Sequence, residues 1–213
     1  MKKILPFVIL AVAFAACNNS DMATNNHDAS GHAAHNDSGS KAKSNAPMAA
    51  LHEAMNRMMT GMKTVKPTGD PDYDFATLMK LHHQSAVEMA KVLVANGTDS
   101  VAKAHAAKTV TEQEGEIAAF DRFLQSAKPS GNSDYGQRAM QMMSAMEHGK
   151  MEMGSLEAIY ASMMIPHHQD GVKMAEEYLK VGRAEELKKI AQSIIQTQPK
   201  EIEDYRQWLK ASE

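Results

Sequence analysis

The sequence contains one His-His motif twice, 85 residues apart, and this repeat constrains the fold more than any other feature. The two copies are residues 78–90 (LMKLHHQSAVEMA) and residues 163–175 (MMIPHHQDGVKMA). The correspondence continues without a gap to Leu124 and Leu209 and reaches back to Ala54 and Ala139. We therefore expect a duplicated unit, with internal repeats at about 51–124 and 136–209.

Both repeats are predicted to be helical, because apolar residues recur at helical spacing and no strand-like alternation is present. Asp70 or Asp72 should cap the helix that follows Pro71. Asn96-Gly97 should end that helix in a left-handed cap. Pro166 and Pro199 should kink their helices unless they begin new ones. The expected helices cover about 47–63, 73–95, 99–126, 135 onward, 156–181 and 184–210.

Two long helices joined by a short glycine turn form an antiparallel hairpin, and two related hairpins form a four-helix bundle. The shorter Met-rich helices are expected to lie across the ends or the side of this bundle. A duplication also implies a pseudo-two-fold axis, which should bring equivalent residues of the two repeats near each other. The predicted fold class is therefore all-α.

The first 16 residues are typical of a secretory signal peptide, with Lys2-Lys3, a short apolar run and a small-residue site before Cys17. Cleavage before Cys17 and lipidation of its thiol follow the bacterial lipoprotein pattern, although Phe14 is a looser match than leucine. The alternative is an ordinary signal peptide with an incidental cysteine. We expect export to the cell envelope, with a lipid anchor on the periplasmic side of a membrane, the outer membrane being favoured.

Residues 17–46 are predicted to form a disordered tether, because they are polar and contain almost nothing to bury. The tether includes His27, His32 and His35 with Met22, so it either collects metal weakly or is a plain linker. Residues 47–213 are then the folded domain. With the signal peptide removed, two basic residues are lost from a net charge of −3, which leaves −5 and excludes nucleic acid as an expected partner.

The repeated motif places imidazole and thioether side chains on one helix face, at 3.6 residues per turn. The small residue between them, Ala86 or Gly171, should leave room one turn beyond the histidines. Imidazole with thioether suits Cu(I), Ag(I) or Cu(II), whereas Ca²⁺ and Mg²⁺ prefer oxygen ligands. Methionine is also abundant, at 18 residues. The candidate metal ligands are His82, His83, His167, His168, Met79, Met89, Met164 and Met174.

Other interpretations of these residues stay open. A methionine stripe at helical spacing, such as Met55, Met58, Met59 and Met62, is often flexible core filler, and paired histidines can serve only as hydrogen-bonding groups. Glu116 and Glu201 recur in the partner helices and are candidates to orient an imidazole, or to form ordinary ion pairs. A possible second metal cluster comprises His148, Met151 and Met153.

The doubled motif, with Met-Ile-Pro-His-His-Gln, a following Met-Ala and a later Gln-x-x-Glu-Ile, resembles the DUF305 family over about residues 69–210. Lys80-Leu81 departs from the family motif in the first copy. This resemblance implies a ferritin-like fold in an exported bacterial protein, and some members are described as periplasmic copper-binding proteins.

Three classes of function fit parts of this sequence. The favoured class is an exported, lipid-anchored protein that binds, stores or relays copper or silver, with Cu(I) as the expected ion and a copper-handling protein or a second copy as a partner. A ferritin-like di-iron oxidoreductase is the enzymatic alternative, but the sequence has no Glu-x-x-His motif for such a site. A helical bundle that binds a protein partner without metal is the third. We therefore expect no enzyme.

Overall fold

The computed structural model describes residues 38–144 and 154–212, with side chains from residue 45 onward, all within one unit that covers residues 37–213. Its elements are helices throughout this described part: α1 (Ser38–Thr64), α2 (Pro71–Asn96), α3 (Ser100–Ser126), α4 (Tyr135–Ser144), α5 (Leu156–Leu179) and α6 (Glu185–Ala211). The expected all-α fold is thus confirmed. None of the described helices has the length and apolarity needed to cross a membrane.

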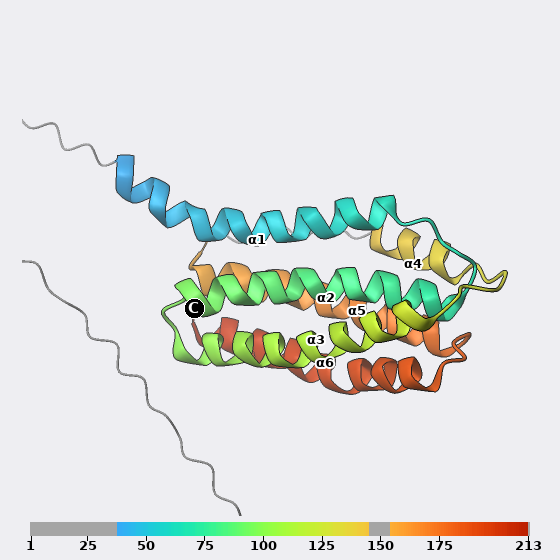
Figure 1. Ribbon diagram of the computed structural model, residues 1–213. Coiled ribbons are helices and arrows are strands. Elements are labelled where there is room, and N and C mark those ends of the chain that lie inside the picture. The colour runs from blue at the N-terminus through green and yellow to red at the C-terminus, as the bar shows by residue number, and fades with distance from the viewer. Residues whose placement is uncertain (1–37, 145–153, 213) are drawn as a thin grey trace, which may run out of the picture. The chain divides into compact units, whose positions relative to one another are not determined.

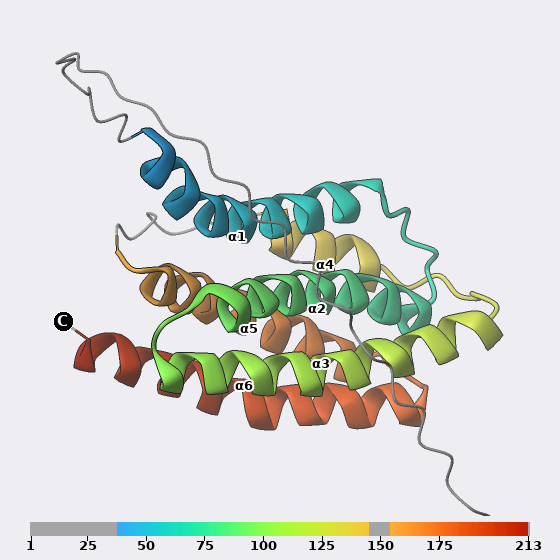
Figure 2. The ribbon, with the colours of Figure 1, turned by 60° about the vertical axis from the view of Figure 1, so that its left-hand side comes forward.

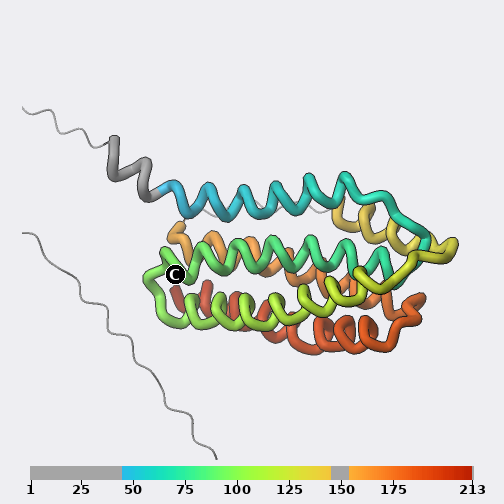
Figure 3. Tube along the Cα trace, in the orientation of Figure 1, coloured from blue at the N-terminus to red at the C-terminus, as the bar shows by residue number. Residues whose placement is uncertain are grey.

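The helices form three layers (Figures 1 and 2). The hairpins α2–α3 and α5–α6 make a four-helix bundle in which α2 packs against α5. Helices α1 and α4, the Met-rich pair, lie along one side of the α2–α5 layer, and α3 and α6 cover the other side (Figures 1 and 3). Because α2 and α5 are covered on both sides, they are buried around most of their circumference.

Local signals account for most of the helix bounds. Asp70 caps α2 by accepting hydrogen bonds from the backbone N–H groups of Asp72 and Tyr73, at 2.9 and 3.1 Å, and Pro71 occupies the first turn. Asp99 caps α3 through the N–H of Ala102 at 2.7 Å. An aspartate carboxylate that accepts hydrogen bonds from backbone N–H groups therefore starts both helices of the first hairpin, and Asp70 is one of the two predicted caps of α2.

Two expectations about the helices differ from the structure, and a third had an alternative that the structure removes. The left-handed cap at Gly97 is wrong, because this residue is extended, with φ −68° and ψ 154°. A Cβ there would lie 2.7 Å from the Leu93 carbonyl oxygen, so glycine allows a close backbone approach. Helix α1 begins at Ser38 and includes Pro47, where the helix was expected to start. Pro166 and Pro199 lie inside α5 and α6, so neither begins a new helix.

Two apolar clusters fill the core, one toward each end of the α2–α5 pair. In the first, the rings of Phe75 and Tyr178 stack with centroids 4.0 Å apart. Gly182 makes room for this arrangement, since a Cβ there would meet the Tyr178 ring at 2.4 Å. In the second, Tyr160 and Tyr205 meet edge to face at 5.8 Å. A layer of polar side chains separates the two clusters.

Candidate metal centre

All four motif histidines lie in this central layer, and each is at most 2% exposed. His82 on α2 and His167 on α5, equivalent residues of the two repeats, stack with ring centroids 3.7 Å apart and 28° between their planes. Each is flanked by its sequence neighbour, at 6.0 Å for His83 and 6.1 Å for His168. The expected meeting of equivalent residues across a pseudo-two-fold axis is confirmed. We call these four residues the histidine layer.

The two outer histidines contact the carboxylates that the sequence singled out. His83 Nε2 lies 2.6 Å from Glu116 Oε2, and His168 Nε2 lies 3.1 Å from Glu201 Oε2. Each glutamate comes from the second helix of the same hairpin, α3 or α6, so the two repeats reproduce the same contact. A carboxylate on one ring nitrogen fixes the orientation of an imidazole, as it does for metal-bound histidines.

The electrostatics of the layer keep the His82 ring neutral. Burial lowers the pKa of His82 well below its usual range, and the neighbouring His167, His83 and His168 rings lower this pKa further. Burial by itself raises the pKa of the Glu201 carboxyl, but His168 and Lys108 outweigh it and lower this pKa to about 2. A neutral imidazole keeps a lone pair on one nitrogen, which is the form that binds a metal ion.

Several ring nitrogens of the layer have no hydrogen-bond partner in the part of the chain that the structure describes. They are both nitrogens of His82 and the Nδ1 atoms of His83 and His168. A buried polar atom left without a partner costs roughly 1–3 kcal/mol, and packing alone does not require histidine at these positions. The layer therefore has the donor atoms of a binding site.

The motif methionines lie on both sides of the histidine layer. Met79 and Met174 belong to the apolar cluster with Phe75, and Met89 and Met164 belong to the cluster with Tyr160. All four are at most 1% exposed. The two-fold axis between the repeats explains this pairing. Met79, which precedes the histidines of its motif, meets Met174, which follows those of the other motif, and Met164 meets Met89 in the same way.

The space beside Gly171 is filled, contrary to the expectation that it would be open. A Cβ at Gly171 would lie 2.8 Å from Gln198 Oε1 and 3.1 Å from Cε1 of the His82 ring. The glycine therefore admits the stacked histidine of the other repeat and a buried glutamine. Gln198 and its equivalent Gln113 were not among the predicted site residues, although both lie at corresponding repeat positions.

Ser85 is a further site residue that the sequence analysis missed. Its Oγ lies 2.8 Å from His167 Nε2, 2.9 Å from the backbone oxygen of His82 and 3.1 Å from Met58 Sδ. Met58 is on α1, so this hydroxyl connects the Met-rich helix to the histidine layer. The signal was weak, because serine stands where the second repeat has Asp170.

The layer does not form a preassembled cage of imidazoles and carboxylates. In the described residues, no three His, Cys, Asp or Glu side chains are grouped so that they could hold a metal ion. The inner rings of His82 and His167 meet face to face, with 28° between their planes. A metal ion here requires thioether ligands, rotation of an imidazole, or both. The predicted roles of these histidines and methionines as ligands stay predictions.

The second predicted cluster, His148, Met151 and Met153, lies outside the described residues, as do Cys17 and the signal peptide. The described methionines nearby do form a small cavity between α1 and α4. Its volume is about 200 Å³, and its lining includes Met59, Met62, Met140 and Met143. Part of the methionine stripe on α1 therefore lies beside Met140 and Met143 of α4, which are the second-repeat equivalents of Met55 and Met58.

Fold and site define a ferritin-like four-helix bundle with a histidine layer at its centre. The chain belongs to the DUF305 family: the family model described as "Domain of unknown function (DUF305)" matches residues 16–124 and 72–209. These two matches end at equivalent positions of the repeats, which supports the duplication. No curated protein shows significant sequence similarity to the chain.

A solved structure described as "CopM in the Ag-bound form (by soaking)" is similar to this protein. Its TM-score is 0.52 and its sequence identity is 26%, and the alignment covers 66% of this chain and 95% of CopM. The likeness therefore extends over nearly all of CopM.

Proposed function

We propose that this protein binds a soft metal ion, Cu(I) or Ag(I), through the histidine layer and the methionines on either side of it. The observation that carries the proposal is the presence of buried imidazoles with unpartnered nitrogens between two pairs of buried thioethers, with the His82 ring held neutral by its burial. Imidazole and thioether favour these ions over hard cations. The similarity to an Ag-bound CopM structure supports the choice of metal.

The proposed role is binding, storage or relay of the metal, with no catalytic step. The proposed location is the cell envelope, with a lipid on Cys17, and the support for it is the pattern of residues 1–17. A copper-handling protein that delivers or receives the ion is the partner this role implies.

Cu(I) binding can be measured by competition with bicinchoninate, on a chain without residues 1–37 so that the tether histidines do not contribute. His82→Ala combined with His167→Ala should weaken binding by at least tenfold, which corresponds to about 1.4 kcal/mol or more. Unchanged affinity in that variant would refute the site.

Methionine variants then separate ligands from core filler. Met79→Leu with Met174→Leu changes one side of the layer, and Met89→Leu with Met164→Leu changes the other. A leucine roughly conserves the volume, so stability should change by less than about 1.5 kcal/mol in either pair. A side that supplies a thioether ligand should lose affinity as well.

The matched control is Met59→Leu with Met143→Leu, which changes two methionines of the cavity between α1 and α4. Its Cu(I) affinity should equal that of the wild type. If the control and both motif pairs bind equally well, the methionines are packing residues, and only the histidine part of the proposal stands.

A further inference from the structure

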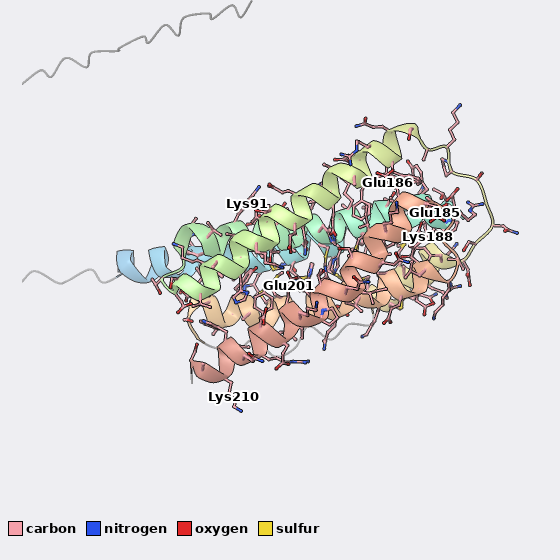
Figure 4. The ribbon with its side chains drawn as sticks, turned by 90° about the horizontal axis from the view of Figure 1, so that it is seen from below. Lys91, Glu185, Glu186, Lys188, Glu201 and Lys210 are labelled. Atoms are coloured by element: carbon pink, nitrogen blue, oxygen red, sulfur yellow. The ribbon has the colours of Figure 1, made fainter. Side chains whose placement is uncertain are left out.

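A polar pocket of about 220 Å³ lies between α3 and α6, on the side of the bundle away from α1 and α4 (Figure 1). Figure 4 looks onto this side and labels Glu201 between the two helices. Its lining residues are all polar: Glu112, Gln113, Glu116, Ser193, Thr197, Gln198 and Glu201. The glutamine pair and the glutamate pair 116/201 occupy equivalent positions in the two repeats, so the pocket lies on the pseudo-two-fold axis that also relates His82 to His167.

Two amide oxygens of the pocket are buried and unpartnered. Gln113 and Gln198 are 4% and 3% exposed, and their Oε1 atoms have no hydrogen-bond partner among the described residues. A buried amide oxygen without a partner is costly. The repetition of this feature in both halves indicates that the oxygens serve a ligand.

The pocket leads to the histidine layer. Glu116 and Glu201 line it and contact the outer histidines, His83 and His168. A Cβ added to Gly171 would lie 2.8 Å from Gln198 Oε1 and 3.1 Å from Cε1 of the His82 ring, so both groups approach this glycine. The lining of the pocket therefore contacts the outer histidines and lies beside His82.

A cation of the protein itself already binds the carboxylates of this pocket. Lys108 Nζ lies 2.8 Å from Glu112 Oε2 and 2.5 Å from Glu201 Oε1. The equivalent of Lys108 in the second repeat is Ser193, and that of Glu112 is Thr197, so only the first repeat supplies this pair. The ammonium group bridges α3 and α6 across the pocket.

We propose that this pocket is the entry port through which a metal cation reaches the histidine layer; the proposal rests on the metal-binding function proposed above. The amide and carboxylate oxygens replace water around the incoming ion. Oxygen ligands hold Cu(I) and Ag(I) only weakly, so the ion passes on to the imidazoles and thioethers. Lys108 competes with the ion for Glu201 and closes the port.

Uptake kinetics test the port. In the full chain carrying Cys17→Ser, with His27, His32 and His35 changed to Ala so that the tether takes up no metal, Ser193→Cys places a thiol at the exposed edge of the pocket. In a separate variant, Ser126→Cys places the thiol at an exposed position on α3 outside the lining. Both thiols are blocked completely with a bulky, uncharged methanethiosulfonate reagent. Cu(I) is then supplied as its coloured bicinchoninate complex, and the loss of colour is followed by stopped flow. The label at 193 should slow uptake at least about tenfold and leave the final affinity unchanged, and the label at 126 should change neither.

Lys108→Ser, which copies the second repeat, tests the closing contact. Uptake should become faster, by about 2- to 10-fold at low ionic strength, and this difference should shrink as salt is added. Lys91→Ser is the matched control, because Lys91 pairs with Glu114 at 2.6 Å on the exposed surface and the change in charge is the same (Figure 4).

Each result of these measurements decides the proposal. A slow 193-labelled variant with a fast Lys108→Ser variant supports the port. Equal rates in all variants, with Cu(I) affinity intact, refute the port and leave metal binding standing. A 193 label that lowers the final affinity as much as the rate places the pocket in the binding site and overturns the port. A wild-type chain that takes up no Cu(I) refutes both proposals.

Discussion

Lowering the pH should destabilise the metal-free protein through His82, whose ring is fully buried and has no hydrogen-bond partner among the described residues. Burial lowers its pKa well below the usual range, so the folded chain keeps this ring neutral. In the unfolded chain the pKa is about 6.5. The unfolded state therefore binds a proton first as the pH falls, and the stability that neutral His82 contributes is present above pH 6.5 and is lost below it.

The size of this effect follows from linkage. With an unfolded pKa of about 6.5 and no protonation of the folded state, moving from pH 7.5 to pH 5.0 lowers the free energy of unfolding by about 2 kcal/mol. Glu201 does not interfere in this range, because its pKa is lowered to about 2 and its contribution is lost only below the unfolded value of about 4.3. Asp170, with its pKa raised to about 6, also titrates between pH 5.0 and 7.5. Its effect is the same in the wild type and in a His82 variant, so it cancels when the two proteins are compared.

The assay is urea unfolding followed by circular dichroism at pH 7.5 and pH 5.0, with EDTA present to remove metal. His82→Gln takes the titrating group away, so its loss of stability between the two pH values should be smaller than that of the wild type by about 2 kcal/mol. An equal loss in both proteins would show that His82 does not stay neutral in the folded state. A neutral His82 imidazole in the metal-free protein would then be refuted.

Gly171→Ala should lower stability, because its Cβ would lie 2.8 Å from Gln198 Oε1 and 3.1 Å from the stacked His82 ring. Displacing both buried groups costs about 1–3 kcal/mol, against a gain of about 1 kcal/mol in helix propensity. Gly115→Ala, where an added Cβ meets nothing within 4 Å, should raise the melting temperature instead. Burial raises the pKa of Asp170 to about 6, so its stabilising neutral form is lost as the pH rises through 6, and Asp170→Asn should raise the free energy of unfolding in urea at pH 7.5 by about 1–3 kcal/mol. Cys17→Ser should leave the chain unlipidated, which mass spectrometry of the membrane and soluble fractions would show; a lipid-free wild type would contradict the anchor.

Much of the architecture was predictable because its signals are local or periodic. The spacing of apolar residues predicted helices over 73–95 and 99–126, and the structure has Pro71–Asn96 and Ser100–Ser126. The repeat predicted two related hairpins, and hence the bundle. The repeat also predicted that equivalent residues such as His82 and His167 lie near each other, because two copies of one unit pack around a common axis. It drew attention to Glu116 and Glu201, because they recur at the same position in both copies. The caps at Asp70 and Asp99 needed nothing beyond their neighbours in sequence.

Tertiary structure alone decided which atoms meet. Helical spacing places Met79 and Met89 on the same face as His82, but the packing of α2 on α5 combines Met79 with Met174 at one end of the layer and Met89 with Met164 at the other. Ser85 joins the site because α5 brings His167 against it, and Gln198 joins because α6 approaches Gly171. The sequence carries no local sign of these approaches. A residue's own helix sets the direction of its side chain, whereas its contacts depend on the rotation and depth of helices distant in sequence, which only the packing of the whole core determines.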